Sequence, residues 1–102
     1  MTNFDEYMTN DNLALQAIIR YDDGREIRVF NVRDKRCCVF IQNDNEHFWL
    51  LRERILEPPM LHNITEAMYQ AGIYDNYYHL SVEVFHGEDS KVYYPRHENF
   101  IL

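Results

Sequence analysis

A β-hairpin is the feature that most constrains the fold of this sequence. Two segments rich in strand-forming residues, Leu13–Tyr21 and Arg25–Val32, flank Asp22-Asp23-Gly24. Gly24 suits the left-handed position of a three-residue hairpin loop. That loop sets a register which pairs Ile19 with Ile27, Ala17 with Val29 and Arg20 with Glu26. One face of the hairpin is then apolar and the other carries an opposite charge pair, so we expect a sheet with one buried face.

The centre of the core is expected between Cys37 and Leu51, which holds the only Trp. A polar turn over Asn31–Arg36 precedes the strand Cys37–Gln42, which is rich in β-forming residues. The stretch after it is ambiguous. It is either a fourth strand to Leu51 with a helical turn at Arg52–Leu56, or a helix that begins at Asn43 and reaches Glu57. We favour the strand, because Phe48 and Trp49 prefer it.

One helix is predicted between the two prolines at 58 and 59 and the glycine at 72. Asn63 is its expected N-cap, with Glu66 three residues on in the reciprocal capping position. Its apolar side comprises Ile64, Ala67, Met68 and Ala71. The helix is short, so its stability must come from packing on a sheet.

The C-terminal third predicts a second hairpin. Tyr77–His86 alternates as a strand, with Leu80, Val82 and Val84 on one face. Gly87–Ser90 then turns the chain into a strand over Lys91–Tyr94, which Pro95 ends. The whole chain is therefore expected to be an α+β domain: a small, mostly antiparallel sheet of five or six strands, with one short helix packed on a face.

The chain length of 102 residues predicts a single domain over 1–102. Residues 1–10 are polar and are expected to form a mobile arm, whereas the apolar end of the tail 96–102 predicts docking on the body or on a partner. We find no secretory signal and no membrane-spanning run, which predicts a cytoplasmic protein. The adjacent Cys37 and Cys38 agree with this, because a disulfide between them would be severely distorted.

The sequence carries no recognisable catalytic, cofactor or metal motif. His79 and His86 are seven residues apart in one predicted strand and so lie on opposite faces, and the other histidines lack ligand spacing. A thiol in an apolar strand is typically buried rather than nucleophilic. We therefore expect no enzyme, no cofactor and no metal.

Charge and tyrosine content provide the functional pointer. The net charge is −7, which disfavours direct binding to nucleic acid, although Arg25–Arg36 contains five cations against two acids. Residues 58–90 contain five acids and no Lys or Arg, interleaved with tyrosines. Tyr is favoured at protein interfaces, and Tyr beside acids suits a basic partner. The expected partner-binding residues are Tyr74, Asp75, Tyr77, Glu83, Glu88, Asp89 and Tyr93.

These observations lead to three functional hypotheses. The first is a small acidic inhibitor that occludes a basic target, such as a nuclease or a nucleic-acid-binding complex, in the manner of phage anti-defence or anti-CRISPR proteins and toxin-immunity proteins. The second is a small enzyme or ligand-binding domain with a pocket made from strand residues such as His79, Glu83 and Tyr93. The third is an assembly subunit that docks through its apolar C-terminus.

Overall fold

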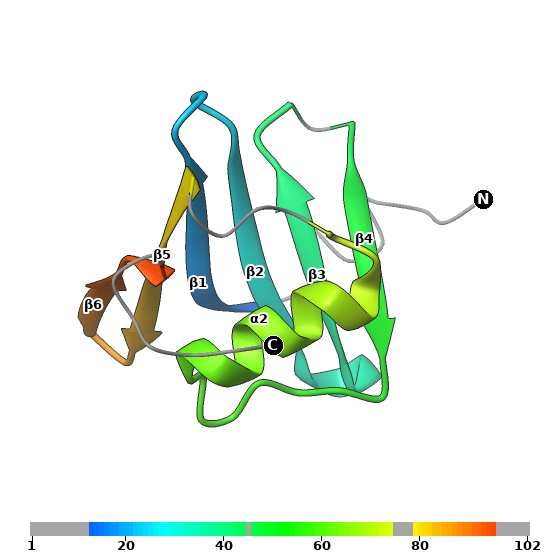
Figure 1. The fold of residues 1–102 in the computed structure, drawn as a ribbon. Helices are drawn as coiled ribbons and strands as arrows, with labels where there is room; N and C mark the ends of the chain where they lie inside the picture. Colours follow the sequence, from blue (N-terminus) through cyan, green and yellow to red (C-terminus); the bar gives the residue numbers. More distant parts are fainter. Residues whose placement is uncertain (1–12, 45, 75–78, 96–102) are drawn as a thin grey trace.

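Within the described residues, six antiparallel strands form one sheet, and one α-helix crosses a face of that sheet (Figure 1). The computed structural model describes residues 13–44, 46–74 and 79–95. The strands are β1 Leu13–Tyr21, β2 Glu26–Val32, β3 Cys37–Gln42, β4 Phe48–Arg52, β5 Leu80–His86 and β6 Asp89–Tyr93. Their order across the sheet is β4-β3-β2-β1-β5-β6. The connection that contains α2 (Leu61–Ala71) leads from the β4 edge back to the other side of β1, so the predicted α+β class is confirmed.

The predicted register of the first hairpin is confirmed. Ile19 pairs with Ile27, Ala17 with Val29 and Arg20 with Glu26. Gly24 has φ +96°, the left-handed conformation that the loop requires. A bulge at Gln16 shifts the register nearer the start of β1.

The main core lies between α2 and the sheet. Ile64, Ala67 and Met68 of the helix are fully buried against the central strands. The strand residues on this face are Ala17, Ile19, Ile27, Val29, Cys38, Phe40, Leu80, Val82 and Val84. Burial of side chains from β1, β2, β3, β5 and the helix is the main stabilising contribution to this fold.

The other face of the sheet is divided by polarity. A second apolar cluster, formed by Val32, Cys37, Val39 and Ile41, lies over β2 and β3. Toward β5, the same face carries the charged side chains of Arg20 and Glu83. The sheet therefore buries apolar groups on one face throughout and on the other face only in part.

The expected polar turn over Asn31–Arg36 is wrong at its start. Asn31 and Val32 belong to β2 and are fully buried, and the turn consists of a short 3₁₀ helix over Arg33–Lys35 that ends at Arg36 in the left-handed conformation. Asn31 is tolerated in the core because its side-chain amide forms two hydrogen bonds with the backbone of Leu56.

The ambiguous stretch after Gln42 is a strand, as we favoured. Phe48–Arg52 pairs with β3, and Trp49 and Leu51 pack on the main core. The helical turn expected at Arg52–Leu56 is wrong, because the structure has no helix there and Glu53 has φ +59°. The chain leaves β4 through this left-handed residue, and the bonds from Asn31 then hold Leu56 in the core.

The helix begins earlier than predicted. It starts at Leu61 with Met60 at the N-cap, and Met60 makes no capping hydrogen bond through its side chain. The predicted capping box of Asn63 and Glu66 is wrong, because both residues lie inside the helix and the Glu66 carboxylate binds Arg54. The predicted end is confirmed: Gly72 has φ +97° and its N–H is donated to the carbonyls of Met68 and Tyr69.

The second hairpin is confirmed with shifted bounds. The structure starts β5 at Leu80, and residues 77 and 78 of the predicted strand lie outside the described residues. The turn is shorter than expected, because β6 already begins at Asp89. Leu80, Val82 and Val84 are buried together, as the alternation predicts. The predicted N-terminal arm 1–10 and C-terminal tail 96–102 also lie outside the described residues.

Candidate protein-binding surface

The two most exposed large hydrophobic side chains of the described chain, Tyr69 and Tyr74, contact each other. Their rings lie edge to face with centroids 5.1 Å apart, and their exposed fractions are 60% and 73%. We call them the tyrosine pair. Exposed aromatic rings that are already ordered against each other lose little entropy when a partner covers them.

The local fold explains why both rings point outward. Met68 is fully buried, so the next residue on α2, Tyr69, faces away from the core. Gly72 ends the helix, and Ile73 returns to the core with an exposed fraction of 4%. The following residue, Tyr74, is thereby directed back toward solvent beside Tyr69.

Polar groups fix the backbone next to the tyrosine pair. Nη1 of Arg54 donates to Oε1 of Glu66 at 2.6 Å and to Oε1 of Gln70 at 2.8 Å, which ties the segment after β4 to α2. The hydrogen bond from Arg54 lowers the pKa of Glu66 below its usual range. The surface beside the pair is therefore held by a charge-assisted contact.

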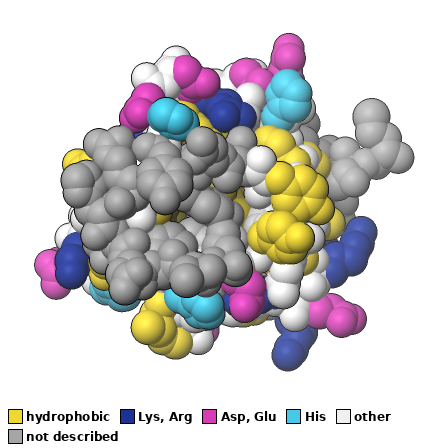
Figure 2. All heavy atoms as spheres, in the orientation of Figure 1, with side chains coloured by type: hydrophobic (Ala, Val, Ile, Leu, Met, Phe, Trp, Pro, Cys, Tyr) yellow, Lys and Arg dark blue, Asp and Glu magenta, His cyan; other side chains and the backbone are white. Residues whose placement is uncertain are grey.

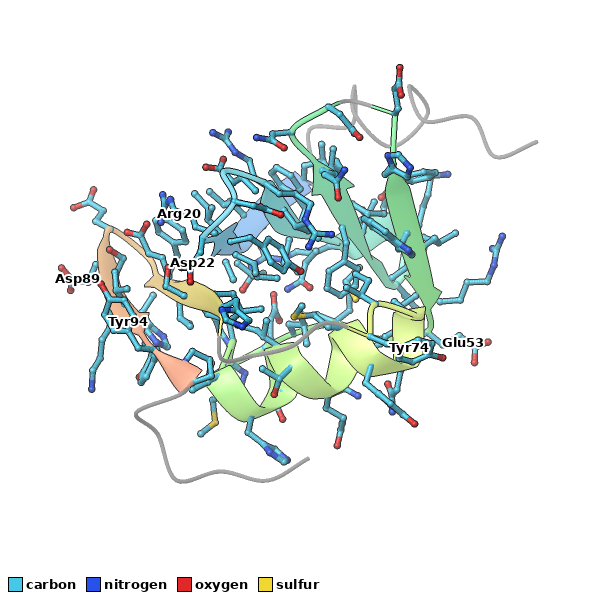
Figure 3. The ribbon with its side chains drawn as sticks, turned by 45° about the horizontal axis from the view of Figure 1, so that its top comes forward. Arg20, Asp22, Glu53, Tyr74, Asp89 and Tyr94 are labelled. Atoms are coloured by element: carbon cyan, nitrogen blue, oxygen red, sulfur yellow. The ribbon has the colours of Figure 1, made fainter. Side chains whose placement is uncertain are left out.

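An acid lies on the same side of the molecule as the tyrosine pair. Figure 3 places Glu53 and Tyr74 together on the side where β4 and α2 end. Glu53 is exposed and makes no ion pair with any described residue. Figure 2 shows hydrophobic side chains gathered over the C-terminal end of α2 and the adjoining part of β4. The surface thus combines an aromatic centre with an unpaired carboxylate.

The predicted partner-binding residues do not all lie together. Tyr74 belongs to the surface beside α2, whereas Asp89 lies on the opposite side of the molecule (Figure 3). Glu88 lies in the β5–β6 turn and Asp89 begins β6; both are exposed and form no ion pair within the described chain. Asp75 and Tyr77 lie outside the described residues.

Glu83 is occupied by contacts inside the protein. Its carboxylate accepts hydrogen bonds from the Ser90 hydroxyl at 2.7 Å and from Nη1 of Arg20 at 2.8 Å. These bonds, with the Ser90 hydroxyl contributing most, lower the pKa of Glu83. Its ion pair with Arg20 joins β5 to β1, so Glu83 acts within the sheet rather than as a free acid.

The pocket proposed from His79, Glu83 and Tyr93 does not form from these side chains. Tyr93 pairs with Val82 and packs on the core beneath α2, whereas Glu83 lies on the other face of the sheet. The ring of His79 is largely exposed beside Asp22, with Nδ1 3.6 Å from Oδ2. The three side chains therefore do not converge on one site.

Two cations of the basic segment Arg25–Arg36 form ion pairs within the protein. Arg28 binds Glu26 and Arg33 binds Glu57, with the shortest N–O distances 3.1 Å and 2.8 Å. The guanidinium of Arg25 stacks on the ring of Tyr21, 3.9 Å from its centroid. These contacts reduce the positive charge that the segment offers to a phosphate backbone.

Sequence reasoning missed a cluster in the β3–β4 loop, where ligand atoms of Asp44, Glu46 and His47 lie within 4.8 Å of one another. The Asp44 carboxylate accepts hydrogen bonds from the backbone N–H groups of Glu46 and His47, at 2.9 Å and 3.0 Å. Those bonds, with the one from Glu46 contributing most, lower the pKa of Asp44. We interpret the cluster as a set of hydrogen bonds that stabilises a tight loop.

Both cysteines are free and buried. Burial raises the pKa of Cys37, and it raises the pKa of Cys38 to about 12. Neither thiol has the accessible setting that a nucleophile needs, because both are buried.

Comparison with known protein families, with curated proteins and with solved structures finds no match to this chain. None of the helices in the described chain has the length and apolarity that crossing a membrane requires.

Proposed function

We propose that the protein is a small acidic inhibitor that binds a basic target protein and occludes its working surface. The observation that carries the proposal is the exposed tyrosine pair, Tyr69 and Tyr74, with Glu53, an acid that makes no ion pair with a described residue, on the same side of the molecule. Tyr is enriched among the residues that dominate binding energy at protein interfaces. Of the residues expected from the sequence, Tyr74 belongs to this surface, and Tyr69 and Glu53 are added to it.

Electrostatics favours a basic partner. The chain has a net charge of −7, and four of its cations, Arg20, Arg28, Arg33 and Arg54, bind acids within the protein. The acids left without a described ion pair include Glu53, Glu88 and Asp89. Such a molecule attracts a positively charged surface at long range and repels nucleic acid.

The partner class that fits best is a protein that itself handles nucleic acid. Such a protein carries Arg and Lys where phosphates bind, and carboxylates can take the positions of those phosphates. Occlusion would then need contact and charge but no catalysis. This is the mode of action of phage anti-defence proteins and toxin-immunity proteins as a class, and we propose the cytoplasm as the compartment, in keeping with two buried free thiols.

Capture from a lysate of the source cell tests the proposal. The tagged protein is immobilised, lysate is applied with and without added nuclease, and bound proteins are eluted with increasing salt and identified by mass spectrometry. We expect one basic protein, retained after nuclease treatment and released at moderate salt, because exposed charges are screened within about 10 Å at 0.1 M salt.

The captured protein is then assayed for its own activity with and without the inhibitor. Loss of that activity at stoichiometric inhibitor supports occlusion. A partner that is acidic, that disappears after nuclease treatment, or that keeps full activity in the complex contradicts it.

A further inference from the structure

The sheet ends in an exposed strand, β6. Each of its residues from Asp89 to Val92 is exposed, and the structure pairs it with β5 on one side only. Within the described part of the chain, no strand pairs with its outer edge. A strand edge presents unpaired N–H and C=O groups that can hydrogen bond to another extended chain.

The hydrogen bonds between the strands determine which residues of β6 direct their backbone groups outward. The N–H of Asp22 donates to the carbonyl of His79 at 2.9 Å, so the odd-numbered residues along β5 direct their backbone groups toward β1. The backbone groups of the even-numbered residues of β5, including Val84, then face β6. They bond to the odd-numbered residues of β6, such as Lys91, which pairs with Val84. The backbone groups of Ser90 and Val92 therefore point away from the sheet.

Side chains along this edge suit contact with a protein surface. Val92 and Tyr94 are exposed by 43% and 47%, which is unusually high for large hydrophobic side chains in this chain. Asp89 and Lys91 carry opposite charges, so β6 is locally neutral although the whole chain is strongly acidic. Repulsion between two copies is therefore small at this edge.

We propose that β6 pairs with β6 of a second copy, antiparallel about a twofold axis at Val92, so that two six-stranded sheets become continuous. Val92 then lies opposite Val92 of the second copy, and Ser90 lies opposite its Tyr94. Outward-facing residues that lie opposite each other exchange two hydrogen bonds, so the Val92 pair is bonded at the centre of this register, which also covers the exposed Val92 and Tyr94 side chains.

The other registers are less favourable. Centring the axis on Lys91 places two ammonium groups directly opposite each other, which destabilises the pair. Centring it on Ser90 brings the β5–β6 turn of each copy against the other strand, and fewer outward-facing residues meet. The axis at Val92 instead places Lys91 opposite Tyr93 of the second copy. Within one chain, the ammonium group of Lys91 already lies over the ring of Tyr93, 4.9 Å from its centroid, so this neighbour suits it.

The pairing is independent of the proposed partner surface. Tyr94 and Asp89 lie on one side of the molecule, and Tyr74 and Glu53 lie on the other (Figure 3). A dimer formed through β6 would therefore present two tyrosine pairs, and either proposal can fail without the other.

Light scattering during size-exclusion chromatography tests the pairing, with the protein loaded from about 1 μM to about 1 mM because self-association depends on concentration. We expect the mass to rise from 12.4 kDa toward twice that value. The variant Val92→Pro removes the outward N–H while keeping a residue that edge strands tolerate, and it is expected to stay monomeric. Val92→Thr keeps the N–H and is the matched control, expected to dimerise like the wild type.

Amide hydrogen exchange of the wild type provides a second test that needs no variant. Exchange at Ser90 and Val92 is expected to slow at least about tenfold between the lowest and highest concentrations, and exchange at Lys91 to change less. A wild type that stays monomeric at the highest concentration overturns the proposal. So does a Val92→Pro variant that dimerises like the wild type, or protection that rises elsewhere and not at β6.

Discussion

The side chain of Asn31 forms hydrogen bonds with both backbone polar groups of Leu56. Its Nδ2 donates to the Leu56 carbonyl at 3.1 Å, and the Leu56 N–H donates to its Oδ1 at 2.9 Å, with both residues buried. One side-chain amide thus satisfies both backbone groups of a residue that enters the core from a loop. This contact fixes the path of the chain from β4 to α2, and so the place where the tyrosine pair is presented.

Replacing Asn31 by Ala should destabilise the protein severely. Both backbone groups of Leu56 would lose their partners inside the core, at a cost of about 3 kcal/mol. Urea unfolding followed by circular dichroism measures this loss. Asn43→Ala is the matched control: Asn43 also bonds to backbone, at Glu26 and Gly24, but it is exposed, so about 1 kcal/mol or less is expected. Equal losses in the two variants would contradict the role given to Asn31.

The two thiols should be unreactive in the folded protein. Burial raises the pKa of Cys38 from 9.0 to about 12, so its thiolate is scarce at neutral pH. A chromogenic disulfide reagent at pH 8 should label both cysteines rapidly in urea and slowly in buffer. Rapid labelling of either thiol without denaturant would show that the strand opens or that the site is accessible.

Cys38 also predicts the direction of alkaline destabilisation. Its pKa is higher in the folded state than in the unfolded chain, so the folded state resists loss of the proton. This contribution is fully present below pH 9.0 and is lost as the pH rises from there toward 12. The urea concentration at the midpoint of unfolding should fall less between pH 7 and pH 11 in Cys38→Ala than in the wild type, when each protein is compared with its own midpoint at pH 7.

Glu66 predicts sensitivity to acid. The hydrogen bond from Arg54 lowers its folded-state pKa below the usual 4.5, so its stabilising contribution is present above pH 4.5 and is lost as the pH falls through the folded value. Thermal unfolding of Glu66→Gln should show a lower midpoint than the wild type at pH 7, with the two curves converging at low pH. Glu53→Gln, at an exposed acid without a described ion pair, should follow the wild type throughout.

Local sequence signals predicted the elements whose cause is local. Gly24 and the opposite charges of Arg20 and Glu26 determined the first hairpin, and Gly72 determined the end of the helix. The strand at Phe48 was correctly favoured from its aromatic residues. Each of these features depends on residues close in sequence or directly paired across one turn.

The features that were missed depend on contacts between distant residues. Asn31 was placed both at the end of the strand Arg25–Val32 and at the start of the polar turn, and Leu56, far along the chain, makes its buried position in the strand favourable. Glu66 was assigned to a cap because its spacing from Asn63 fits, but Arg54 binds it instead. The candidate surface was found only in part for the same reason: Tyr74 was expected, but its contact with Tyr69 requires the chain reversal at Gly72.

The most direct test of the central claim compares tyrosine variants in binding to the captured partner. Calorimetry measures the affinity of the wild type, of Tyr69→Ala/Tyr74→Ala, and of Tyr94→Ala, an exposed tyrosine on the far side of the molecule. The double variant should bind at least about 30-fold more weakly, as expected for loss of interface residues worth about 2 kcal/mol. Tyr94→Ala should bind within about 3-fold of the wild type, because substitutions outside the interface core cost little. Equal affinity of the double variant and the wild type would show that the partner binds elsewhere and would contradict the proposed surface.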